Sequence, residues 1–172
     1  GIELTYNRDN REVTPLLTST WDQGARYNEL CPEAAGGPGG RVWAGCVATA
    51  MSQIINYWRF PNQGTGSHGY YSDYGYLFAD YGASNYDFNQ MNDNINGESN
   101  YEMAEIQYHC GIAVDMMYSP NGSGAYSDDA ADALRTYFGY SPELAIEYKD
   151  NYNDADWKAL IIANLDNGWP LY

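Results

Sequence analysis

A cysteine at the start of a predicted helix is the residue of this sequence best suited to covalent chemistry. Cys46 follows Gly45, and apolar residues then recur at the spacing of a helix with one buried face until Pro61 ends the pattern. These residues are Val47, Ala50, Met51, Ile54, Ile55 and Trp58. A cysteine attacks as the thiolate, and the unpaired amide groups at a helix N-terminus stabilise an anion. The placement suits a nucleophile, although packing in a core is the more common role of such a cysteine.

The remaining cysteines and the histidines add no obvious partner for this nucleophile. The three cysteines include no C-x-x-C pair, which argues against a disulfide framework and a thiolate zinc site. We expect Cys110 to be a small core residue, whereas Cys31 is either exposed or paired with a cysteine that is missing from this chain. His68 lies in a glycine-rich loop, and His109 points about 100° away from its helical neighbour Cys110. Both histidines are therefore expected to be structural or surface residues.

The segments before and after the Cys46 helix are predicted to be largely irregular. Residues 1–22 are expected to form an extended segment, and a loop follows over 23–44. Its glycine run at 36–40 lacks the Gly-Lys-Ser/Thr ending of a phosphate-binding loop and indicates a flexible connection. Residues 62–97 are rich in Gly, Tyr, Asn and Asp, and they predict irregular structure with short strands.

Three further helices are expected: one that opens at Ser99 and runs to about Cys110, and two over about 127–138 and 154–165. Ser99 and Glu102 have the spacing of a capping box at the start of the first one, and Gly111 is expected to end it. Residues 112–116 are expected to form a short strand or connection. Residues 169–172 resemble the beginning of a strand, at which point the sequence stops.

The bulk composition limits the classes of partner. The chain has 172 residues, 44% of them hydrophobic, which is enough for one domain with a core. Its formal net charge of −15 disfavours nucleic acids and anionic membrane surfaces, and no apolar run is long enough to span a bilayer. The 18 tyrosines suit either a surface that binds polymers or peptides, or a solvated loop.

Two acidic or amide-rich stretches resemble metal sites only superficially. The asparagines of 92–97 have calcium-loop spacing, but the first is not aspartate and Glu102 falls one residue short of the bidentate position. The dipole of a helix N-terminus accounts for Asp128, Asp129 and Asp132. We therefore expect no metal and no organic cofactor.

The order of motifs along the chain resembles the streptopain family of cysteine peptidases. Residues 45–58, with Phe60 and Pro61, resemble the nucleophile helix of that family, and residues 21–24 resemble the segment that carries its oxyanion glutamine. The resemblance continues over nearly the whole chain from about Val13. The further matching stretches are 111–116, 122–124, 133–134, 137–140, Trp157 and 170–172.

This resemblance implies an α+β, papain-like fold whose helical half is present and whose β half is mostly missing from this chain. It implies that Cys46 is the nucleophile and that Gln23 donates the side-chain hydrogen bond of the oxyanion hole. Without the family, a surface glutamine in a loop would be the better interpretation of Gln23. The residues expected to border the substrate are Gly45, Gly122, Ser123 and Gly124.

The family also implies a domain organisation and a setting. Its catalytic histidine comes from a Gly-Gly-His segment beyond Tyr172, so we expect a single peptidase domain that is incomplete at its C-terminus. Residues 1–12 would be a leader or the end of a pro-segment, and 13–172 the nucleophile-bearing part. Family members are secreted bacterial zymogens, which predicts an extracellular, periplasmic or cell-surface location.

The expected function is that of a thiol endopeptidase acting on proteins or peptides, with a pro-segment or a C-terminal companion chain as further partners. One alternative is a catalytically silent homologue that binds peptides without cutting them. Another is one chain of a two-chain enzyme that needs a C-terminal piece. A glycan-binding module using the tyrosines is a third alternative, but it would not need a cysteine that opens an amphipathic helix.

Overall fold

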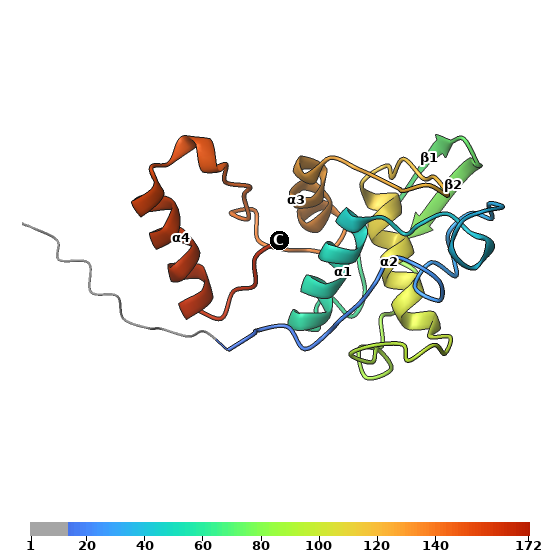
Figure 1. The fold of residues 1–172 in the computed structure, drawn as a ribbon, viewed down its shortest axis with the longest axis horizontal. Helices are drawn as coiled ribbons and strands as arrows, with labels where there is room; N and C mark the ends of the chain where they lie inside the picture. Colours follow the sequence, from blue (N-terminus) through green and yellow to red (C-terminus); the bar gives the residue numbers. More distant parts are fainter. Residues whose placement is uncertain (1–13) are drawn as a thin grey trace, which may run out of the picture.

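Four α-helices and one β-hairpin form the part of the chain that the structure, a computed structural model, describes, which is residues 14–172 (Figure 1). The leader or pro-segment expected at 1–12 lies outside these described residues. The elements are α1 (Cys46–Trp58), β1 (Ser67–Ser72), β2 (Gly75–Asp80), α2 (Tyr101–Ala113), α3 (Ser127–Thr136) and α4 (Asp154–Asp166), with short 3-10 turns η1 (Pro38–Gly40) and η2 (Lys149–Asn151). Within 14–172 no helix is long and apolar enough to cross a membrane.

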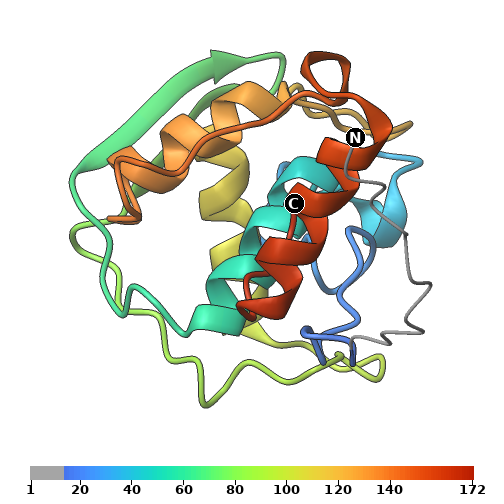
Figure 2. The ribbon, with the colours of Figure 1, turned by 90° about the vertical axis from the view of Figure 1, so that its left-hand side faces the viewer.

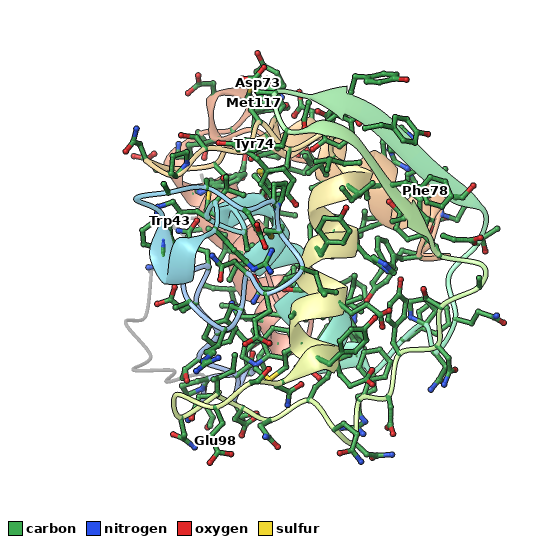
Figure 3. The ribbon with its side chains drawn as sticks, turned by 90° about the vertical axis from the view of Figure 1, so that its right-hand side faces the viewer. Trp43, Asp73, Tyr74, Phe78, Glu98 and Met117 are labelled. Atoms are coloured by element: carbon green, nitrogen blue, oxygen red, sulfur yellow. The ribbon has the colours of Figure 1, made fainter. Side chains whose placement is uncertain are left out.

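Helix α2 is the centre of the fold. It contacts α1, both strands of the hairpin and α3. Figure 3 shows it (yellow) with side chains packed along it, between the N-terminal loops and the hairpin. Its buried residues are Met103, Ala104, Ile106, Gln107, His109, Cys110, Gly111 and Ile112. Because neighbours enclose α2 on several sides, its buried residues do not form the single stripe that a surface helix shows.

Helix α2 does not end where its glycine predicted. Gly111 lies inside the helix, which continues to Ala113. A Cβ at position 111 would collide with the hydroxyl of Tyr118. Gly111 therefore allows the segment that carries Tyr118 to approach the helix closely. The prediction that Gly111 ends the helix was wrong.

The start of α2 is also capped differently from the prediction. The N-cap is Asn100, whose side chain accepts a hydrogen bond from Met103 N at 3.0 Å. The hydroxyl of Ser99 is instead bonded to Glu29, far away in the sequence. Asparagine and serine are both favoured at the N-cap, so the sequence alone did not separate these two adjacent candidates.

The helix that carries the cysteine agrees closely with its prediction. Helix α1 begins at Cys46 and ends at Trp58, and Met51 and Ile55 in its apolar stripe are fully buried. Trp58, the last member of the predicted stripe, is 44% exposed and lies at the end of the helix. Helix α3 starts at Ser127 as expected and stops at Thr136, two residues before the predicted end.

The short strands predicted within 62–97 are an antiparallel hairpin. In the register of β1 and β2, Tyr71 lies opposite Tyr76 and His68 lies opposite Ala79. One face of the hairpin covers α2, since Ala79 is buried, while Tyr71 on the other face is 86% exposed.

Helix α4 lies apart from the other elements (Figure 1), and Figure 2 looks onto it from its own side. No residue of α4 is buried, and Ile162 on it is 39% exposed. The hydroxyl of Tyr57 on α1 donates to the Gly168 carbonyl at 2.8 Å just after the helix. Residues 169–172, predicted to start a strand, form no strand here.

His109 is a buried structural histidine, as expected. Its Nδ1 lies 2.8 Å from the hydroxyl of Tyr86, and the side chain contacts the ring of Tyr81. Burial disfavours the charged imidazolium and lowers the pKa of His109 to about 4, while the carboxylate of Asp80 opposes this shift. The folded protein therefore holds His109 neutral down to acidic pH.

Because His109 stays neutral in the folded protein, the free energy of unfolding should fall as the pH is lowered. Between pH 6.5 and 4 the unfolded chain protonates His109 and the folded chain does not, so the free energy of unfolding falls with pH, by about 3 kcal/mol at pH 4. At pH 7 and above this loss is absent. Urea unfolding of the wild type and of His109→Gln at pH 7, 5.5 and 4 measures the effect. The difference between the two proteins should shrink as pH falls, and a constant difference would contradict the assignment.

Candidate active site

Cys46 is the first residue of α1 and the exposed member of the three free cysteines. The residue before it, Gly45, forms the N-cap with φ of 96° and ψ of 140°. The Gly45 carbonyl accepts the amide of Thr49 at 3.0 Å and closes the first turn. The helix thus presents the Cys46 side chain to solvent at its N-terminal end.

Gly45 is required by its backbone conformation and by its neighbour Met116. A positive φ of this size is open to glycine and strained for other residues. A Cβ at this position would also lie 2.5 Å from both Sδ and Cε of Met116, which is fully buried. Met116 therefore packs against the backbone immediately before the cysteine.

Replacing Gly45 with alanine should cost stability by two separable effects. The backbone conformation at φ of 96° and ψ of 140° costs a non-glycine residue about 1–3 kcal/mol, and displacing the flexible end of Met116 adds to it. Gly36 provides a control for the positive φ, because it has φ of 88° with no atom near its Cβ position. We expect Gly45→Ala to lower the free energy of unfolding by more than Gly36→Ala does, and to slow alkylation of Cys46 by moving its backbone. Equal losses in both variants would show that Met116 imposes no constraint.

The segment that contains Gln23 lies beside the residues before Cys46. The Gln23 carbonyl accepts a hydrogen bond from Ala44 N at 2.9 Å, two residues before the cysteine. The Gln23 side chain is half-buried, and the adjacent Asp22 turns the chain by accepting the amide of Gly24. The structure therefore brings Gln23 and Cys46, 23 positions apart in the sequence, into one region.

Two further glutamines hold this segment, and the sequence analysis missed both. Gln53 on α1 accepts hydrogen bonds from Trp21 N at 3.2 Å and from the Ser19 hydroxyl at 3.0 Å. Gln107 on α2 donates to the Asp22 carbonyl at 3.0 Å. The one available signal was that each glutamine interrupts a predicted apolar helix next to residues expected to be buried.

The Gly122–Gly124 loop lies on the other side of the chain that leads to the cysteine. The hydroxyl of Ser123 donates to the Trp43 carbonyl at 2.7 Å and accepts the Ser119 amide at 3.0 Å. Gly124 pairs with Met117 in an isolated bridge. The Ser123 hydroxyl is thus used to hold the loop in place, whereas nothing lies within 4 Å of the Cβ positions of Gly122 and Gly124.

Both histidines of the chain are engaged with partners other than Cys46. His68 Nε2 lies 2.7 Å from Asp115 Oδ1, and its ring packs near Tyr137. His109 is bonded to Tyr86 in the core. Burial raises the pKa of the Tyr172 phenol, its hydrogen bond to the Ser127 hydroxyl at 3.4 Å opposes this shift, and the charge of Cys46 adds to it.

The remaining cysteines are poor nucleophiles. Cys31 is 1% exposed, and burial raises the pKa of its thiol to about 12 although the Tyr118 hydroxyl 4.0 Å away opposes the shift. Full burial likewise raises the pKa of Cys110 well above that of a free thiol. The expectation that Cys110 is a core residue is confirmed. Cys31 is a buried free thiol, so the suggestion that it is exposed was wrong.

The aspartates weighed as a possible metal cluster act in other ways. Asp128 and Asp129 lie in the first turn of α3, where the helix dipole favours acidic residues. Asp132 forms an ion pair with Arg135 one turn later. Among residues 14–172 no group of three His, Cys, Asp or Glu side chains is arranged to hold a metal ion.

Known proteins with similar sequences and structures are bacterial cysteine proteases. The chain is 30% identical to streptopain of Streptococcus pyogenes over 197 residues, covering 99% of this chain and 50% of streptopain. It is 30% identical to the thiol protease/hemagglutinin PrtT of Porphyromonas gingivalis over 165 residues, covering 92% of this chain and 18% of that protein. The chain thus spans half or less of these curated relatives.

The fold agrees with the same group. Active interpain A, a cysteine protease of Prevotella intermedia, matches with a TM-score of 0.83 and 38% identity, covering 91% of this chain and 66% of that structure. A prointerpain A structure from the same organism matches with a TM-score of 0.81 and 37% identity, covering 88% of this chain and 51% of that structure. The expected papain-like α+β fold is therefore confirmed.

The family model of the Peptidase C10 family matches residues 21–172, from the segment that holds Gln23 to the last residue, Tyr172. The match covers the Cys46 helix, the Gly122–Gly124 loop and α4. The chain therefore belongs to the Peptidase C10 family of cysteine peptidases.

Proposed function

We propose that this chain is the nucleophile-bearing part of a secreted bacterial endopeptidase that cuts proteins through an acyl-enzyme on Cys46. The observation that carries the proposal is the position of Cys46. It is an exposed thiol at the start of α1, beside the Gln23 segment and the Gly122–Gly124 loop. The bacterial relatives and the acidic composition support the setting, and the prointerpain A match supports a zymogen origin.

In this mechanism the Cys46 thiol gives its proton to a general base, and its sulfur attacks the carbonyl carbon of the scissile peptide bond. A bond forms between sulfur and carbon while the carbonyl oxygen becomes an oxyanion, which the Cys46 amide and the Gln23 side-chain amide would stabilise. The carbon–nitrogen bond then breaks, and the leaving amine takes a proton from a general acid. Water hydrolyses the thioester in the second half and regenerates the thiol.

The general acid and base must come from elsewhere in this proposal. Among the described residues, neither histidine forms a hydrogen bond with Cys46: His68 is bonded to Asp115, and His109 is buried and bonded to Tyr86. We therefore place the catalytic histidine in polypeptide that follows Tyr172. Residues 13–172 would then be part of one peptidase domain, completed by this further polypeptide.

The exposed helix α4 indicates that the complete enzyme contains a companion polypeptide that covers this helix. Half-buried Leu160, Ile161 and Leu165 accompany the exposed Ile162 on a helix that buries none of its residues. Such an apolar helix is expected to pack against another element. The companion can be a continuation of the same chain or a separate chain. A homologue that only binds peptides would keep this interface and lose the downstream histidine.

Site-resolved alkylation with iodoacetamide tests the placement of the nucleophile. At pH 7.5 we expect Cys46 to react at least about 100-fold faster than Cys31 and Cys110, because only Cys46 is exposed and burial keeps the other two protonated. Mass spectrometry of the digested protein gives the rate at each cysteine. Unfolding in urea is the control, since it should make the three rates similar. Protection of Cys46 in the folded protein would remove the basis of the proposal.

A further inference from the structure

The side chain of Gln107 is a fully buried amide in the middle of α2, with 0% exposure. Both ends of the amide are used. Its Oε1 accepts a hydrogen bond from the Thr49 hydroxyl at 2.9 Å, and its Nε2 donates to the Asp22 carbonyl at 3.0 Å. A buried amide with good partners holds them firmly, because leaving any of these groups unpaired costs about 1–3 kcal/mol.

The two partners of Gln107 belong to the two halves of the proposed oxyanion hole. Thr49 lies three residues after Cys46 on α1, so it is on the next turn of the same helix. Asp22 immediately precedes Gln23. Gln107 thus connects the helix that carries the nucleophile to the segment that carries the side-chain donor, and its own helix packs directly against α1.

Other bonds hold the ends of this segment, and they leave Gln107 between them. Gln53 binds Trp21 N on one side of Asp22. Ala44 N binds the Gln23 carbonyl on the other side. The segment is therefore attached to α1, to α2 and to the strand-like chain before Cys46. Loss of the Gln107 contact would free the peptide between Asp22 and Gln23 while both ends stay attached.

We propose that Gln107 is a positioning residue that sets where the Gln23 side-chain donor stands relative to Cys46. The inference rests on the proposed function, because it gives Gln23 and Cys46 their roles. Displacing an oxyanion donor by about 1 Å can cost about 100-fold in rate, so a buried residue that does not contact substrate can have a large effect.

A pair of reagents distinguishes positioning from folding. A peptide aldehyde adds reversibly to the Cys46 thiol. A sulfur–carbon bond forms as the carbon–oxygen π bond breaks, and negative charge develops on the aldehyde oxygen at the oxyanion position. That oxygen then takes the thiol proton and remains there as a hydroxyl that can accept a hydrogen bond. Iodoacetamide instead displaces iodide at a carbon and develops no charge on a carbonyl oxygen that the protein must hold. The aldehyde therefore depends on the Gln23 donor and iodoacetamide does not.

The variants Gln107→Met and Gln107→Glu are compared with the wild type and with Gln90→Met, which alters an exposed loop glutamine. Gln107→Met removes both hydrogen bonds at similar volume. Gln107→Glu is the conservative variant, because it keeps an acceptor for Thr49, and burial favours its protonated form, whose O–H can still donate to the Asp22 carbonyl. Affinity for the aldehyde is measured on the complete enzyme that contains this chain, as protection of Cys46 from iodoacetamide. Far-UV circular dichroism verifies that each variant is folded.

We expect Gln107→Met to bind the aldehyde about 10–100-fold more weakly while iodoacetamide alkylates Cys46 within about twofold of the wild-type rate. Gln107→Glu should lose less affinity than Gln107→Met, and Gln90→Met should match the wild type in both measurements. Unchanged aldehyde affinity in Gln107→Met, or an equal loss of alkylation and aldehyde binding, would overturn the positioning role. If the wild type itself forms no aldehyde adduct although Cys46 is reactive, the proposed function fails, and the positioning role fails with it.

Discussion

Replacing Cys46 with alanine is expected to reduce peptide hydrolysis by at least about 10⁴-fold in the complete active enzyme that contains this chain. The reason is that the first chemical step forms a bond to its sulfur, which no other described cysteine can replace. Cys31 and Cys110 are buried, and neither opens a helix. The measurement is kcat/KM for a fluorogenic peptide that the wild-type enzyme cuts.

The control for this variant is Cys110→Ala, which removes a buried thiol from α2. It should cost about 1–2 kcal/mol in the free energy of unfolding through the lost packing, and it should leave kcat/KM unchanged within about threefold. Cys46→Ser, which keeps a weak nucleophile of similar size, should be nearly as inactive as the alanine variant. Substantial hydrolysis by either Cys46 variant would exclude the acyl-enzyme on this residue.

Replacing Gln23 with alanine should lower kcat by about 10²–10³-fold and leave KM nearly unchanged. The proposed donor acts on charge that develops only after attack, so its loss raises the barrier without weakening the binding of substrate. The backbone bond from Ala44 N to the Gln23 carbonyl does not involve the side chain, so the segment should keep its place in the variant.

Two comparisons sharpen this test. Gln23→Glu replaces the amide donor with a carboxylate that repels an oxyanion, and it should be at least as slow as Gln23→Ala. Gln90→Ala alters an exposed loop glutamine and should have wild-type kinetics. A raised KM with unchanged kcat would show that Gln23 contacts the substrate in its ground state and would contradict the oxyanion role.

The sequence determined the nucleophile helix almost completely. One face of this helix is buried, so the apolar residues after Cys46 recur with the period of an α-helix and predict it directly. Pro61 marks the end of the pattern. Helix α4 was predicted to within a residue for the related reason that local capping by Asn153 decides its start. These features depend on residues within a few turns of one another.

The ends of α2 could not be predicted in the same way. Gly111 is a usual helix terminator, but here it makes room for Tyr118, which lies in the following segment. Ser99 has the spacing of a capping box, but its hydroxyl is occupied by Glu29. In both places a contact from outside the helix overrides the local preference.

In the candidate site, too, local features could be predicted from the sequence and long-range contacts could not. The sequence by itself determined that Cys46 opens a helix, and a resemblance was needed to single out Gln23, since nothing local distinguishes it from a surface glutamine. Only the tertiary structure decided that Gln107 joins Asp22 to Thr49 and that Ser123 holds Trp43. These hydrogen bonds link residues 58 to 85 positions apart. They form only once α1, α2 and the loops have packed together, because a buried polar group binds whichever partner the fold places beside it.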